Sequence, residues 1–182
     1  MENHSTANAV NRQRRAGILL HPTSLPGPLG HGDFGHQAYR FIEFLNTSGF
    51  KVWQMLPLGP THDEKSPYQC LSSHAGNPLL ISIDWLEDKG WLDRKKIRIN
   101  LSEESHRRYC LQQAAEKFYL LEDDEWIARI EEFSLDHAYW LEDFALFMAL
   151  KGRYKGSPWY EWPAALVHRK KIALDAARAE LH

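Results

Sequence analysis

Short apolar runs alternate with polar, glycine- or proline-rich segments in the first part of the chain. Residues 16–20 are apolar and predict a buried strand, and residues 52–58 predict a second one. Between them, residues 22–35 contain three Pro and four Gly and predict a loop with unusual backbone angles. Residues 36–48 then predict a helix whose apolar positions recur at i, i+3, i+4 and i+7. These positions are Ala38, Phe41, Ile42 and Leu45.

The pattern turns helical after a long polar loop that begins at Ser66. Residues 79–83 are apolar and β-branched, which predicts a strand or an extended segment. Ser102 is placed to cap one of the helices that follow. The helices predicted by periodicity and composition cover residues 85–92, 103–121, 125–133, 137–151 and 163–181.

A strand, a helix and a second strand within about forty residues predict a βαβ unit with parallel strands. Two or three parallel strands cannot close a sheet, and a parallel sheet needs cover on both faces. A (β/α)₈ barrel takes about 250 residues. The expected fold class is therefore α/β, the beginning of a larger barrel. The expected organisation is a disordered tail over residues 1–15, the βαβ part over 16–100 and a mostly helical region over 101–182.

Composition narrows the classes of partner. The formal net charge is −2 and the basic residues are scattered, so no sustained basic face is present for nucleic acid. No window approaches the roughly 20 apolar residues of a membrane helix. Cys70 and Cys110 form no CxxC pair, which favours a reducing, cytoplasmic setting.

Several carboxylates and histidines are candidates for catalytic or metal-binding roles. Asp33 lies in the glycine-rich loop, where hydrogen bonds to loop backbone are its expected role. Asp63 and Glu64 are expected in a solvated loop, and Glu142 and Asp143 on the polar face of a helix. The spacing of the histidines matches no metal-ligand pattern, and no dinucleotide fingerprint opens a helix after a strand. The residues therefore predict neither a metal site nor a dinucleotide-binding site.

The segment SPYQCLSSHAGNP, residues 66–78, is the strongest candidate for a binding site. Tyr68 combines an aromatic face with a hydroxyl, which suits a sugar ring. Ser66, Gln69 and Asn77 add hydrogen-bonding groups. A purely structural loop remains an open alternative, since residue types alone do not separate the two readings.

Several long motifs resemble one known family. They are GILLHPTSLPGPLGHGDFG at 17–35, WQMLPLGPT at 53–61, SPYQCLSSHAGNPLLI at 66–81, WLEDFALFMALK at 140–151 and PWYEWP at 158–163. In this order they resemble the amino-terminal part of the 4-alpha-glucanotransferases, or amylomaltases, of glycoside hydrolase family 77. The resemblance implies a (β/α)₈ barrel with helical insertions and no cofactor. It also implies transfer of α-1,4-glucan segments between maltodextrins, with retention through a covalent glycosyl-enzyme.

The same resemblance assigns Ser66 and Tyr68 to the donor side of the substrate cleft. The nucleophile, acid/base and transition-state carboxylates of the family lie on later barrel strands, and no residue here matches them. No catalytic residue is therefore assigned, and the chain is expected to be an inactive amino-terminal fragment. The alternative is a truncated, non-catalytic protein that at most binds glucan weakly.

Overall fold

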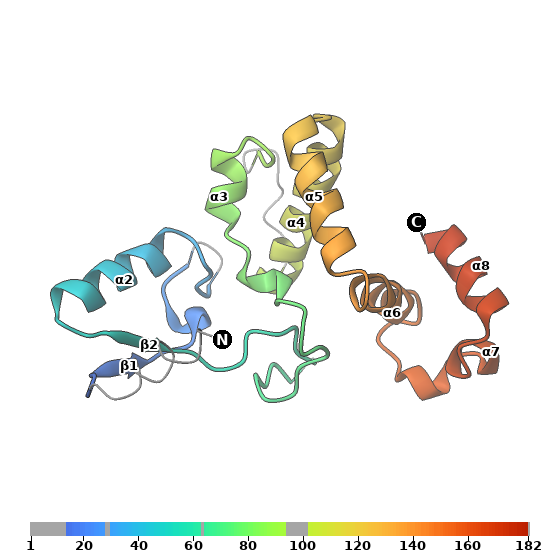
Figure 1. Cartoon of the computed structure of the whole chain (residues 1–182), viewed down its shortest axis with the longest axis horizontal. Coiled ribbons are helices and arrows are strands. Elements are labelled where there is room, and N and C mark those ends of the chain that lie inside the picture. The colour runs from blue at the N-terminus through green and yellow to red at the C-terminus, as the bar shows by residue number, and fades with distance from the viewer. Residues whose placement is uncertain (1–13, 28–29, 63, 94–101, 182) are drawn as a thin grey trace, which may run out of the picture. The chain divides into compact units, whose positions relative to one another are not determined.

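The computed structural model describes residues 14–27, 30–62, 64–93 and 102–181 (Figure 1). These residues form two compact units that divide between Asp123 and Asp124. The first unit contains β1 (Gly17–Leu19), η1 (Pro22–Ser24), α2 (His36–Thr47), β2 (Val52–Gln54), η2 (Pro78–Leu80), α3 (Ile83–Asp88) and α4 (Glu103–Leu120). The second contains α5 (Asp124–Asp136), α6 (Leu141–Arg153), η4 (Trp159–Glu161), α7 (Ala164–Val167) and α8 (Lys171–Leu181).

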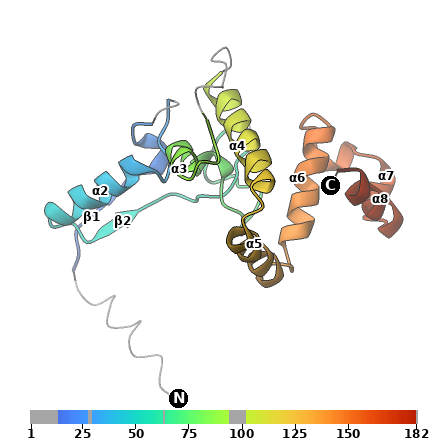
Figure 2. The same cartoon turned by 90° about the horizontal axis from the view of Figure 1, so that it is seen from above.

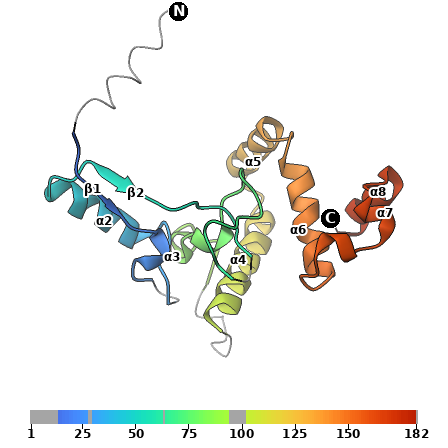
Figure 3. The same ribbon diagram turned by 90° about the horizontal axis from the view of Figure 1, so that it is seen from below.

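The predicted βαβ unit is present. Strands β1 and β2 pair in parallel, with Gly17 opposite Val52 and Leu19 opposite Gln54. The helix between them, α2, runs alongside the pair (Figure 3). It packs on β2 through Phe41, whose ring meets Trp53 edge-on at 4.9 Å between centroids. The helix predicted over residues 36–48 is thus confirmed.

The strands are shorter and more exposed than predicted. Leu19 is 57% exposed and Val52 is 39% exposed, so the expectation of buried strands is wrong for these side chains. The physical reason is that each strand presents side chains to both faces of the sheet, and one helix cannot cover both. The pair therefore leaves apolar side chains in solvent.

Residues 79–83, predicted to be a strand or an extended segment, form no strand; Ile81 and Ser82 are extended, but two local caps place their neighbours in η2 and α3. Asn77 accepts the backbone N–H of Leu79 at 3.0 Å, and Pro78 opens the 3₁₀ turn η2. Ser82 then accepts the N–H of Trp85 at 3.2 Å and starts α3.

The core of the first unit lies between α3 and α4. It contains Ile83, Leu86, Leu92, Cys110 and Ala114, with Trp91 and Leu111 packed against it. Ser102 caps α4 as predicted, by accepting the N–H of Ser105. Helix α4 packs on α3 within the first unit.

The second unit is helical throughout its regular structure (Figure 2). Its core joins Leu146 and Leu150 of α6 to Trp162 and Ala177. The prediction of a single helix over 163–181 is wrong. The segment forms two helices, α7 and α8, and between them Arg169 has a φ of +51°. This break turns α8 back, so that its apolar face can pack on α6. Each helix among the described residues is too short or too polar to span a lipid bilayer.

Candidate functional site

The polar loop of residues 66–78 folds back on the segment that follows β2. Leu71 donates its N–H to the carbonyl of Pro60 at 2.7 Å, and Asn77 donates to Leu58 at 2.8 Å. A β-carbon added to Gly59 would lie 2.8 Å from the carbonyl oxygen of Ser72, so the segment after β2 and the polar loop approach closely. Backbone hydrogen bonds therefore hold the loop at its middle, Leu71, and near its end, Asn77.

Tyr68 of this loop is 74% exposed. It lines a hollow of about 600 Å³, called here the loop hollow, together with Cys70, Ser72 and His74. Ser66 is half-buried, and its carbonyl accepts the N–H of Gln69 at 3.1 Å. The two residues predicted from the sequence thus share one turn, and Tyr68 is the one that faces open space.

A second hollow separates this loop from the glycine-rich loop. Its volume is about 500 Å³, and His21, His31, Lys65 and Asn77 are among its lining residues, so it is called the histidine hollow. The Nδ1 atom of His21 lies 2.7 Å from the hydroxyl of Thr23, within hydrogen-bond distance.

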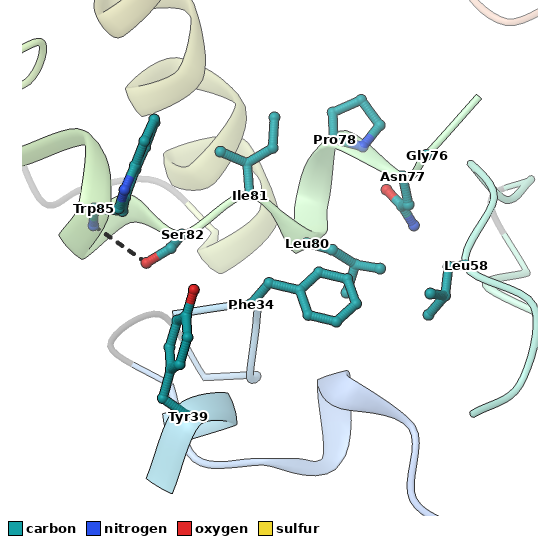
Figure 4. A pocket seen from close by; sticks show the side chains of 10 residues that line it. All are labelled: Phe34, Tyr39, Leu58, Gly76, Asn77, Pro78, Leu80, Ile81, Ser82 and Trp85. Atoms are coloured by element: carbon teal, nitrogen blue, oxygen red, sulfur yellow. Dashed lines mark hydrogen bonds between the residues drawn. The ribbon is translucent and has the colours of Figure 1, made fainter. Parts of the chain in front are cut away.

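A third hollow, of about 660 Å³, is shown in Figure 4. Phe34 from the glycine-rich loop, Tyr39 from α2 and Trp85 from α3 line it, so it is called the aromatic hollow. Ser82 and Asn77 supply polar groups on its wall. Since Asn77 also lines the histidine hollow, the two spaces adjoin.

The walls of these hollows are held by a buried ion pair. Asp33 accepts the N–H of Gly35 on Oδ1 at 2.8 Å, which confirms its predicted role in the loop backbone. Its Oδ2 lies 3.0 Å from Nη1 of Arg107 on α4, and the two side chains are 7% and 0% exposed respectively. Sequence reasoning missed Arg107. The available signal was a charged residue in register with the buried Cys110 and Ala114, at i+3 and i+7.

The other candidate carboxylates lie away from these hollows, except Asp63 and Glu64, which come just before the polar loop in sequence; Glu64 and Glu142 are exposed, as predicted. Asp143 contacts Arg169 at 2.6 Å and Arg178 at 3.4 Å in the second unit. Asp63 is outside the described residues. Within the described part of the chain, no three His, Cys, Asp or Glu side chains gather closely enough to hold a metal ion.

The arrangement suits binding of a polar ligand with apolar faces. Each hollow falls in the range of about 300–1,000 Å³ typical of ligand sites. Exposed aromatic rings can cover the apolar face of such a ligand, while hydroxyl, amide and imidazole groups bind its polar edge.

A family model described as 4-alpha-glucanotransferase matches residues 20–182. The chain belongs to the 4-alpha-glucanotransferase family. This confirms the resemblance carried by the motifs, and the match includes both loops, α4 and the whole second unit.

Individual 4-alpha-glucanotransferases agree with this assignment. That of Thermus thermophilus is 40% identical over 174 residues, which is 92% of this chain and 35% of that protein. That of Aquifex aeolicus is 42% identical over 170 residues, or 88% of this chain and 34% of that protein. The chain therefore spans about a third of the length of these relatives.

A solved structure of this family is also similar in fold. It is the amylomaltase from Streptococcus agalactiae in complex with acarbose, with a TM-score of 0.83 and 35% sequence identity. The similarity covers 92% of this chain and 36% of that one.

Proposed function

We propose that this chain forms part of a 4-alpha-glucanotransferase that moves α-1,4-glucan segments between maltodextrin chains. In this proposal β1, α2 and β2 begin a (β/α)₈ barrel, and the helical residues 101–182 are an insertion region. The reaction retains the anomeric configuration through a covalent glycosyl-enzyme, needs no metal or organic cofactor, and takes place in the cytoplasm. Family membership supports the proposal at the level of reaction class.

The observation that carries the binding part of the proposal is the exposed ring of Tyr68 beside the loop hollow. A tyrosine that is 74% exposed, on a loop that Leu71 and Asn77 anchor by backbone hydrogen bonds, is free to stack on a sugar ring. Ser66, two positions before Tyr68, offers a hydroxyl for a sugar hydroxyl. We assign both to the donor side of the glucan cleft.

We assign no catalytic residue in this chain. A retaining mechanism needs two carboxyl groups about 5–5.5 Å apart, one as nucleophile and one as acid/base. Asp33 is committed to Arg107 and to the N–H of Gly35, and Asp143 to two arginines. The 182-residue chain alone is therefore expected to release no glucose from maltotriose above a blank.

Titration of maltoheptaose into the chain by calorimetry tests the binding part. Tyr68→Ala is expected to weaken the affinity about tenfold, which corresponds to about 1.4 kcal/mol. Ser66→Ala is expected to have a smaller effect, since it removes one hydroxyl. The matched control is Tyr119→Ala, which removes a ring that is 63% exposed on α4, away from the loop. Equal affinity for the Tyr68 and Tyr119 variants would remove Tyr68 from the site.

A further inference from the structure

Arg107 is the largest side chain that the first unit buries completely. It comes from α4, whereas its hydrogen-bond acceptors come from two other segments. Nη1 donates to Oδ2 of Asp33 at 3.0 Å and to the carbonyl of Ile81 at 2.9 Å. Nη2 donates to the carbonyl of His31 at 3.4 Å. One guanidinium therefore joins the glycine-rich loop to the segment between η2 and α3.

These two segments are the facing walls of the hollows. His31 lines the histidine hollow, and Ile81 lines the aromatic hollow beside Phe34. The walls also meet directly, since the N–H of Phe34 donates to the carbonyl of Leu80 at 3.0 Å. The guanidinium thus binds backbone carbonyls of residues that line the hollows; Figure 4 shows Phe34, Leu80 and Ile81 at the aromatic hollow.

The ion pair between Arg107 and Asp33 is a poor way to stabilise the fold. Burying a guanidinium and a carboxylate removes both from water, and the attraction between them often does no more than offset that loss. The Nε atom of Arg107 is also buried without a hydrogen-bond partner among the described residues. An apolar side chain would pack this face of α4 without that penalty. What an apolar side chain cannot do is hold three oxygen atoms from two segments at fixed positions.

We propose that Arg107 is a positioning residue of the glucan cleft. Together with Asp33 it sets the separation of the glycine-rich loop from the segment 80–82, and through them the shape of the histidine and aromatic hollows. The proposal rests on the proposed function for the identity of the ligand, but the positioning itself is a property of the chain.

The experiment compares Arg107→Lys and Asp33→Asn with the unchanged chain. Lys keeps the charge but cannot reach three acceptors from a single nitrogen with the geometry of a guanidinium. Asn keeps the shape of Asp33 and removes its charge. The control is Arg129→Lys, because Arg129 forms an exposed ion pair with Glu125 at 2.9 Å in the second unit. Near-UV circular dichroism selects a temperature at which every variant is folded.

Amide hydrogen exchange is the first readout. Both variants are expected to speed exchange about tenfold at the N–H groups of Phe34 and Gly35, because local opening frees these donors. Exchange in the middle of α4, at Ala114, is expected to stay unchanged. If exchange instead rises equally at Ala114, Arg107 is a general stabilising residue and the proposal is overturned. Unchanged exchange at all three positions overturns it as well.

Affinity for maltoheptaose is the second readout, at the same temperature. Both variants are expected to bind about tenfold more weakly than the unchanged chain, or 1.4 kcal/mol, while Arg129→Lys binds normally. Faster exchange at Phe34 and Gly35 with normal affinity overturns the link to the cleft. Absence of maltoheptaose binding by the unchanged chain contradicts the proposed function instead, and the exchange data then still decide whether Arg107 positions the two walls.

Discussion

The indole N–H of Trp53 donates to the carbonyl oxygen of Leu20 at 2.7 Å, across 33 positions of sequence. Trp53 lies on β2 and also packs against Phe41 of α2. Leu20 follows β1 and precedes His21, the first lining residue of the histidine hollow. One side chain therefore connects all three elements of the βαβ unit at the point where the glycine-rich loop begins.

Trp53→Phe tests this connection. Phenylalanine keeps an aromatic ring against Phe41 but has no donor, so the carbonyl of Leu20 loses its side-chain partner. We expect a loss of about 1 kcal/mol in the free energy of unfolding, measured by urea denaturation. Trp159→Phe is the control, because that ring is 53% exposed and lies in the second unit. An equal change in both variants would show that the hydrogen bond contributes nothing.

The βαβ unit was predictable because its signals are local. Ala38 and Leu45 fall on one helical face, and both are buried. The apolar runs around Ile18 and Trp53 gave the two strands and their parallel direction. The exposure of Leu19 could not be read from them, since it depends on how many elements cover the sheet. An apolar run predicts a strand, but the burial of its side chains depends on which elements pack on the sheet.

Gly35 closes the glycine-rich loop where it meets the cap of α3. A β-carbon on Gly35 would lie 2.3 Å from Oγ of Ser82 and 2.7 Å from Oδ1 of Asp33. Gly35→Ala is therefore expected to lower the free energy of unfolding by about 1–3 kcal/mol through overpacking. The measurement is again urea denaturation.

Gly76 provides the matched control for this substitution. A β-carbon there would meet no atom within 4 Å. Gly76→Ala is expected to be nearly neutral. If the Gly35 variant proves as stable as the Gly76 variant, then Ser82 and Asp33 can move aside, and the close packing around Gly35 does not constrain the loop. Gly35→Ala is expected to cost less in a Ser82→Ala background than in the unchanged chain, because the nearest clashing oxygen is then absent and the lost cap of α3 is common to both members of the comparison.

The second unit has a carboxylate whose charge state should affect α8. The side-chain hydrogen bond from Lys171, 2.6 Å from Asp175, lowers the pKa of Asp175 below its ordinary value of 3.8. A folded-state pKa below the unfolded one means that ionised Asp175 favours the fold. This contribution is present above about pH 3.8 and disappears as the pH falls through the lowered pKa.

Thermal unfolding of Asp175→Asn as a function of pH checks this. We expect the variant to melt below the unchanged chain at pH 7, and the two melting curves to converge under acid conditions. The difference is expected to be small, because the pair is exposed and salt screens it. Glu132→Gln, which changes an exposed carboxylate on α5, serves as the control. A gap that persists at low pH would assign the effect to helix propensity instead of charge.

The candidate site was predictable only where its residues are neighbours in sequence. Tyr68 and Ser66 lie on one loop, whose residue types made it a candidate, and the family resemblance then assigned these two residues to the substrate cleft. The aromatic hollow was not foreseen, because Tyr39 and Trp85 come from α2 and α3 and converge only after folding. Arg107 was missed for the same reason, since its partner Asp33 lies 74 positions away. A periodic apolar face identifies a buried stripe, but not which loop a charged residue in that stripe will hold.

The central claim is that the loop around Tyr68 binds α-1,4-glucan. The most direct test is an NMR titration of the ¹⁵N-labelled chain with maltoheptaose, which locates binding residue by residue. The account predicts amide shifts concentrated in residues 66–77, with smaller ones at Phe34 and in 80–82, and none above background in 124–181. Shifts confined to the second unit, or no saturable shifts at all, would contradict it.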